Sequence, residues 1–206
     1  REDQYHGGQL IDVYKIYLQT HEDELYDMLM LHNREDLEGM PLILPILNYP
    51  DFFEHPFLLK NETVLDDRVI LQLENPVFLP VSCACRTELG SFSADGQKAV
   101  LEIPFYRGVL KHFYENYKDY YYLIYEDTAV HKSIGEFVEK SARRKATAKT
   151  CYTKKEGSFF PLADVWDRPM FQEEYHGKLL FGEYTDGIFE CPEFLEKYIK
   201  KIAFAK

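Results

Sequence analysis

The spacing of apolar residues divides this chain into two parts. Up to about residue 47, apolar positions recur every three or four residues, the spacing that places side chains on one face of a helix. Residues 8–19 are predicted to form one helix, and a second begins after residue 21 with acidic residues in its first turn. Residues 41–47 predict a short apolar helix. A kink or restart is expected at Pro41, because proline is tolerated in the first turn of a helix but not inside one.

Beyond residue 62, apolar residues alternate with polar ones, as in half-buried strands. The Asp95-Gly96 pair predicts a hairpin turn. Residues 108–117 are expected to form a short helix, and Pro192 is expected to open an amphipathic helix that closes the chain. Further strands are predicted at 69–73, 81–88, 99–103, 120–125 and 145–153, a helix or turn at 134–142, and a hairpin over 170–184.

These patterns predict an α+β protein. Residues 1–50 form a helical segment, 51–61 a linker, and 62–206 a mainly antiparallel sheet domain with a C-terminal helix. The apolar content of 46% is that of a folded chain. No apolar run approaches the roughly 20 residues that span a bilayer, so no membrane partner is expected. Four cysteines without a C-x-x-C pair favour a reducing, cytoplasmic setting.

The pair most suggestive of chemistry is His32 with Asp36 on the second predicted helix. Residues four apart lie one turn apart on the same face, so the imidazole and the carboxylate are expected to meet. Together they could hold a divalent cation or position a water molecule. The alternative is an ordinary surface contact or a satisfied core pair.

The sequence His32-Asn33-Arg34-Glu35-Asp36 resembles the last active-site motif of the DEDD ribonuclease-H-like 3′–5′ exonucleases. Within them it is most similar to the predicted exonucleases of the YprB type. That motif is an aromatic residue or histidine, then asparagine, two variable residues and aspartate. The resemblance covers about residues 5–50, including the apolar stretches on either side of the motif.

The resemblance implies that residues 1–50 are the C-terminal helices of a ribonuclease-H-like domain. It further implies that Asp36 is a catalytic ligand of Mg²⁺ or Mn²⁺ in the intact protein. The residue at His32 would orient or deprotonate the attacking water. The family's other three carboxylates come from upstream elements. The resemblance therefore implies that this region is inactive and binds no cofactor alone, and that its partner is the missing N-terminal part of the same protein.

A second candidate site is a basic strip, residues 140–155, which has a local charge of +7 and no acidic residue, against −18 for the other 190 residues. A predicted strand would turn Lys145, Thr147, Lys149 and Thr153 to one side, a face suited to phosphates and favouring a single strand. The alternatives are an edge strand protected by lysines or a protein partner. The candidate nucleic-acid-binding residues are Arg143, Arg144, Lys145, Lys149, Lys154 and Lys155.

Two other groups have a functional and a structural interpretation. The tyrosines between residues 114 and 125 could stack on bases, although such density is more typical of a core. Cys83 and Cys85 are interpreted as packing residues, since no second pair lies at metal-site spacing. The first functional hypothesis is the C-terminal region of a metal-dependent 3′–5′ exonuclease acting on nucleic acid. The alternatives are a non-catalytic nucleic-acid-binding domain and a protein-interaction domain.

Overall fold

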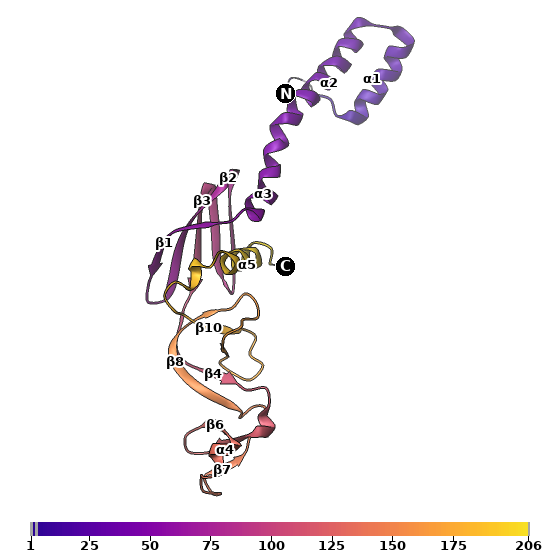
Figure 1. Cartoon of the computed structure of the whole chain (residues 1–206). Coiled ribbons are helices and arrows are strands. Elements are labelled where there is room, and N and C mark those ends of the chain that lie inside the picture. Colours follow the sequence, from indigo (N-terminus) through magenta and orange to yellow (C-terminus); the bar gives the residue numbers. More distant parts are fainter. Residues whose placement is uncertain (1, 3, 206) are drawn as a thin grey trace. The chain divides into compact units, whose positions relative to one another are not determined.

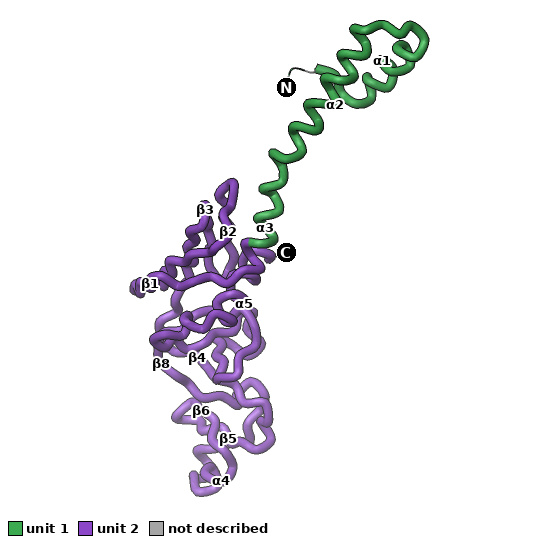
Figure 2. Tube along the Cα trace, turned by 45° about the horizontal axis from the view of Figure 1, so that its top comes forward, with its two compact units in different colours: residues 1–51 green, residues 52–206 purple. Residues whose placement is uncertain are grey.

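The computed structural model describes residue 2 and residues 4–205. The chain divides into two compact units, Arg1–Asp51 and Phe52–Lys206 (Figure 2). Unit 1 is helical, and unit 2 holds antiparallel sheets with a helix near the C-terminus (Figure 1). The predicted α+β class is confirmed. Among the described residues, no helix has both the length and the apolar character to cross a bilayer.

Unit 1 is built on a helical hairpin. α1 spans Gly7–Thr20 and α2 spans Asp23–Ile43, so both predicted helices are confirmed. His21 makes the turn between them with a left-handed backbone (φ 55°), and its N–H donates to the carbonyl of Tyr17 at 2.8 Å. The ring of Tyr17 also contacts His21 and Tyr26, at centroid distances of 5.7 and 5.8 Å. The hairpin is therefore fixed by backbone capping and by aromatic contacts at its turn.

The predicted restart at Pro41 does not occur, because α2 runs through this residue to Ile43. A 3₁₀ turn, η1, follows over Leu44–Leu47, and α3 spans Asn48–Glu54. Pro41 has no N–H to donate to the carbonyl one turn earlier. It lies in the last turn of α2, so the helix loses this hydrogen bond close to its end. The segment 51–61, predicted as a linker, holds the end of α3 and the start of β1.

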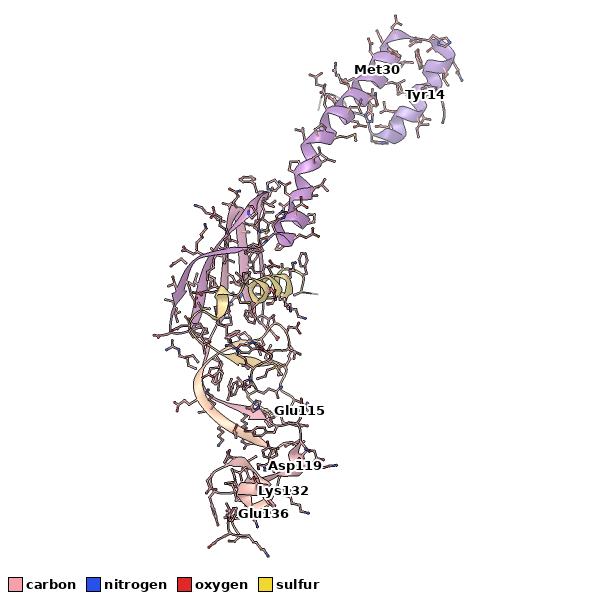
Figure 3. All side chains as sticks on the ribbon, viewed as in Figure 1. Tyr14, Met30, Glu115, Asp119, Lys132 and Glu136 are labelled. Atoms are coloured by element: carbon pink, nitrogen blue, oxygen red, sulfur yellow. The ribbon has the colours of Figure 1, made fainter. Side chains whose placement is uncertain are left out.

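Unit 1 buries little apolar surface. Of its described residues, only Leu10 is buried, whereas Tyr14 of α1 and Met30 of α2, both labelled in Figure 3, are 51% and 45% exposed. Leu37 and Met40 of α2 are each 59% exposed. Contiguous exposed apolar surface usually marks an interaction face.

The first sheet of unit 2 has the order β1-β2-β3, with β1 at Leu58–Val64, β2 at Arg68–Thr87 and β3 at Gly90–Pro104. The strands predicted at 69–73 and 81–88 belong to the single long strand β2. The hairpin predicted at Asp95-Gly96 is wrong, since the chain turns at residues 88–89. Gly96 instead lies opposite Leu79, between two register shifts, with φ 56°. Its left-handed backbone therefore serves a β-bulge rather than a turn.

Two smaller antiparallel sheets complete unit 2, with orders β4-β8-β10-β9 and β6-β5-β7. β5 and the hairpin of β9 with β10 confirm predicted elements. The predicted helix at 108–117 is wrong, because most of that segment is β4, paired along its length with β8. The bounds are β4 Tyr106–Phe113, η2 Tyr117–Asp119, β5 Tyr120–Leu123, β6 Thr128–His131, α4 Lys132–Gly135, β7 Arg143–Lys145, β8 Tyr152–Pro161, β9 Met170–Phe171, β10 Phe181–Glu183 and η3 Ile188–Glu190.

The closing helix α5, Pro192–Ala203, confirms the predicted amphipathic helix and covers β2 and β3. Its buried side chains recur with helical spacing, and the buried residues of β2 and β3 alternate along each strand. The buried set is Leu195, Tyr198, Ile199 and Ile202 on α5, with Val69, Leu71, Leu73, Ala99, Leu101 and Ile103 on the strands.

A buried amide holds the start of unit 2 to β2. Asn75 is 1% exposed, and its side-chain nitrogen donates to the carbonyl of Phe52 at 2.9 Å. Its side-chain oxygen accepts the N–H of Val77 at 2.9 Å, beside the register shift of β2. One side chain thus satisfies backbone groups on two elements that would otherwise be unpaired.

We expect Asn75→Ala to lower the free energy of unfolding by about 1–3 kcal/mol, because it leaves buried backbone groups without a partner. Asn61→Ala is the control, since Asn61 is exposed and its side chain bonds only to the Thr63 hydroxyl among described residues. It should change stability by less than about 0.5 kcal/mol. Chemical denaturation measures both, and equal losses would contradict a special role for Asn75.

Candidate functional site

His32 and Asp36 lie side by side on α2, as their spacing predicts. The Nε2 atom of His32 is 3.2 Å from Oδ2 of Asp36, and the two side chains are 18% and 52% exposed. The imidazole is therefore largely covered, while the carboxylate faces solvent. A carboxylate in this position can accept a hydrogen bond from the imidazole or act as an oxygen ligand of a cation.

Among the grooves along α2 that the described residues of unit 1 form, two border the motif. The larger, about 940 Å³, is lined by Met30, Leu31 and Leu37 together with Asn33 and Arg34 of the motif. The smaller, about 710 Å³, includes Asp36 itself. The motif therefore borders open space on two sides.

The described residues do not assemble a metal site around His32 and Asp36. No group of three or more histidine, cysteine, aspartate or glutamate side chains comes together in the described part of the chain. A two-metal phosphodiesterase site needs several carboxylates. His32 and Asp36 alone do not make such a site.

The basic strip is not one continuous face. The strand predicted over 145–153 is wrong, because β7 ends at Lys145 and β8 begins at Tyr152. Between them the N–H of Thr147 donates to the hydroxyl of Thr150 at 2.9 Å, which closes a turn. Residues 147–150 form hydrogen bonds among themselves and therefore do not pair with a neighbouring strand.

Four of the six predicted binding residues are engaged inside unit 2. The guanidinium of Arg143 lies 4.5 Å from the ring centre of Tyr121, and that of Arg144 lies 4.8 Å from Tyr122. Lys155 pairs with Glu183 at 2.6 Å, and Lys154 pairs with Asp127. Such contacts hold the side chains to the protein, although exposed cations can also exchange partners.

Lys145 and Lys149 are exposed and form no ion pair with the described residues. Figure 3 labels four charged residues near the β6-β5-β7 sheet. Three are acidic and one is basic: Glu115, Asp119, Glu136 and Lys132. The surroundings of the strip are therefore of mixed charge, which weakens any field directed at a phosphate chain.

A polar network at Asp127 was not predicted from the sequence. The hydroxyls of Tyr122 and Tyr152 both donate to Oδ1 of Asp127, and Lys154 pairs with Oδ2. Asp127 lies in the turn between β5 and β6 with a left-handed backbone (φ 50°). The only sequence signal was an aspartate between two short strands, a residue type that tolerates this conformation.

The network is a clamp that links β8 to the turn between β5 and β6. Lys154 and the two tyrosine hydroxyls hold the pKa of Asp127 far below its ordinary value. Burial, together with the Asp127 charge, raises the pKa of Tyr152 well above the usual range. The carboxylate stays ionised and the phenol stays protonated, so neither group is suited to exchange protons near neutral pH.

Three of the dense tyrosines are half-buried against a small core cluster. Tyr114 and Tyr120 stack with centroids 4.7 Å apart, and with Tyr122 they pack against Ala129 and Cys151. Tyr125, by contrast, is 79% exposed.

The cysteine pair of β2 is half-buried. Burial raises the pKa of the Cys83 and Cys85 thiols, which disfavours the thiolate needed for metal binding. The packing interpretation of these two residues therefore agrees with their surroundings.

Comparison with protein-family models, curated proteins and solved structures finds no match to this chain.

The Asp127 clamp predicts a pH dependence of stability. The folded-state pKa of Asp127 lies below that of the unfolded chain, about 3.9, so its contribution is present above that pH and is lost on further acidification. Asp127→Asn should lower the melting temperature at pH 7, and the gap from wild type should shrink by pH 3. Thermal melts across this range measure the gap, with Asp167→Asn, an exposed aspartate, as the control. A gap independent of pH would contradict the clamp.

Proposed function

We propose that this chain is the C-terminal region of a metal-dependent 3′–5′ exonuclease acting on nucleic acid. Residues 1–50 would supply the last active-site motif, and unit 2 would be an accessory domain that guides the strand. The observation that carries the proposal is the contact of His32 with Asp36, 3.2 Å apart on α2 with the motif's spacing. The four cysteines are unpaired, in keeping with a cytoplasmic enzyme.

Asp36 would provide one carboxylate to Mg²⁺ or Mn²⁺ in the intact protein. Such ions, when bound, activate water and stabilise the leaving oxygen of a phosphodiester. Asp36 and His32 restrict each other's rotation, and this keeps the imidazole beside the carboxylate. His32 would then accept a proton from, or orient, a water molecule at that position.

The uncovered apolar faces of α1 and α2 give independent support. Unit 1 buries only Leu10 among its described residues, while Ile11, Leu37 and Leu42 are 58%, 59% and 79% exposed. Helices in proteins gain most of their stability from packing an amphipathic face. We propose that these helices pack on the remainder of a ribonuclease-H-like domain in the intact protein.

In the intact protein, Asp36→Asn should abolish metal-dependent cleavage of a labelled oligonucleotide while leaving the melting temperature unchanged. His32→Ala should lower the rate by about 10²–10⁴-fold, the usual contribution of a general base. The matched control is Asp23→Asn, which makes the same change in the first turn of α2, outside both grooves, and should leave turnover intact. Near-normal turnover in Asp36→Asn would remove the motif from the active site.

The chain by itself should not degrade oligonucleotides with either metal ion, because its described residues gather no third ligand beside His32 and Asp36. Robust degradation by the chain that disappears in Asp36→Asn would overturn the claim that the site needs other ligands.

A further inference from the structure

Unit 2 contains an open groove that belongs to none of the sites predicted from the sequence. Its volume is about 990 Å³, and one wall is the exposed side of α5. The other walls come from the turn between β2 and β3, the segment after β8, and the residues before β10. The lining residues used below are Lys197, Lys200, Lys201, Leu89, Leu162, Leu179 and Phe204.

Three lysines line the α5 wall of this groove. Lys197, Lys200 and Lys201 recur at i, i+3 and i+4, so they share the helix face opposite the buried one. All three are exposed, and none forms an ion pair with the described residues. Lys197 and Lys201 are one turn apart, about 6 Å along the axis, so two ammonium groups can reach neighbouring phosphates.

The two acidic residues that line the groove, Glu88 and Asp164, each have a bonding partner. Glu88 pairs with Lys178, and Oδ1 of Asp164 accepts the N–H of Val165 at 2.7 Å. The groove therefore keeps a positive wall in a chain whose net charge is −11. A local cationic surface on an acidic protein favours an anionic partner at that place.

The floor of the groove is apolar and ends in an aromatic ring. Leu89, Leu162 and Leu179 line it, and Phe204 at the end of α5 is 61% exposed. One edge of Phe204 meets Phe53 with centroids 5.0 Å apart, which holds the ring in place. An exposed, supported aromatic ring next to cations is the combination that binds single strands without sequence preference.

We propose that this groove binds single-stranded nucleic acid, with phosphates on Lys197, Lys200 and Lys201 and a base stacked on Phe204. It would be the surface by which the accessory domain guides a strand, and in that respect it rests on the proposed function. The lysine wall alone would suit any polyanion, whereas the ring beside it favours a ligand that carries bases.

The test uses the full chain and a fluorescently labelled oligothymidylate of about ten nucleotides, within the usual site size of such proteins. Affinity is measured by anisotropy over a salt series. The variant Lys197→Gln/Lys200→Gln/Lys201→Gln should bind about tenfold or more weakly, and its salt slope should fall by about 0.7 for each phosphate that it no longer neutralises. The matched control, Lys98→Gln/Lys118→Gln/Lys140→Gln, removes the same charge from exposed positions of unit 2 outside this groove and should change affinity much less.

Phe204→Ala tests the stacking interaction separately. It should weaken binding about tenfold without changing the salt slope, because a stacked base carries no counterion. An abasic strand of the same length should bind the wild type more weakly than oligothymidylate and should be insensitive to Phe204→Ala. Circular dichroism melts of each variant establish that the fold is retained.

Three results would overturn the groove proposal: no binding by the wild-type chain, equal reductions of affinity in the two lysine variants, or equal affinity for the abasic strand. Each leaves the exonuclease proposal to be judged by the Asp36→Asn assay in the intact protein. Failure of the exonuclease proposal, in turn, would not alter the binding measured here, so the two failures are distinguishable.

Discussion

The architecture of unit 2 depends on the hydroxyl of Tyr198. This side chain is fully buried on α5, and its oxygen lies 2.9 Å from the carbonyl of Leu89 and 2.7 Å from that of Pro161. The single proton is shared between the turn of the first sheet and the end of β8 in the second. Burial raises the pKa of this phenol far above its usual value, so it remains a donor. The same hydrogen bonds join α5, the turn between β2 and β3 and the end of β8, which border the groove beside α5.

The two units differ in how completely they satisfy their own apolar surface. Unit 2 encloses a core between α5 and the long strands, and the buried amide of Asn75 ties the backbone of Phe52 to that core. Unit 1 offers a hairpin of helices with one buried residue among those described. In the proposed exonuclease, the exposed apolar face of unit 1 would pack on the rest of the catalytic domain. This asymmetry links the local geometry of α2 to the proposed role of the whole chain.

Some local features were predictable from the sequence, whereas the long-range ones were not. The contact of His32 with Asp36 follows from helical spacing alone, and the pattern of α5 predicted its buried face. The pairing of β4 with β8 joins segments some 45 residues apart, so the local sequence at 108–117 misleadingly indicated a helix. Likewise the local sequence leaves Lys154 and Lys155 open to an outside anion, whereas the fold brings Asp127 and Glu183 to them. Charge runs indicate local potential, but their partners are set by topology.

If unit 2 holds a strand in the groove beside α5, photo-cross-linking detects it most directly, because a bromouracil-substituted single strand reacts with the side chains that it contacts. After irradiation with the wild-type chain and proteolysis, mass spectrometry identifies the modified peptides. We expect cross-links at Phe204 and in the peptides that contain Leu89 and Leu162, which share the groove. Cross-links confined to residues 140–155, or spread evenly over unit 2, would contradict binding at this groove.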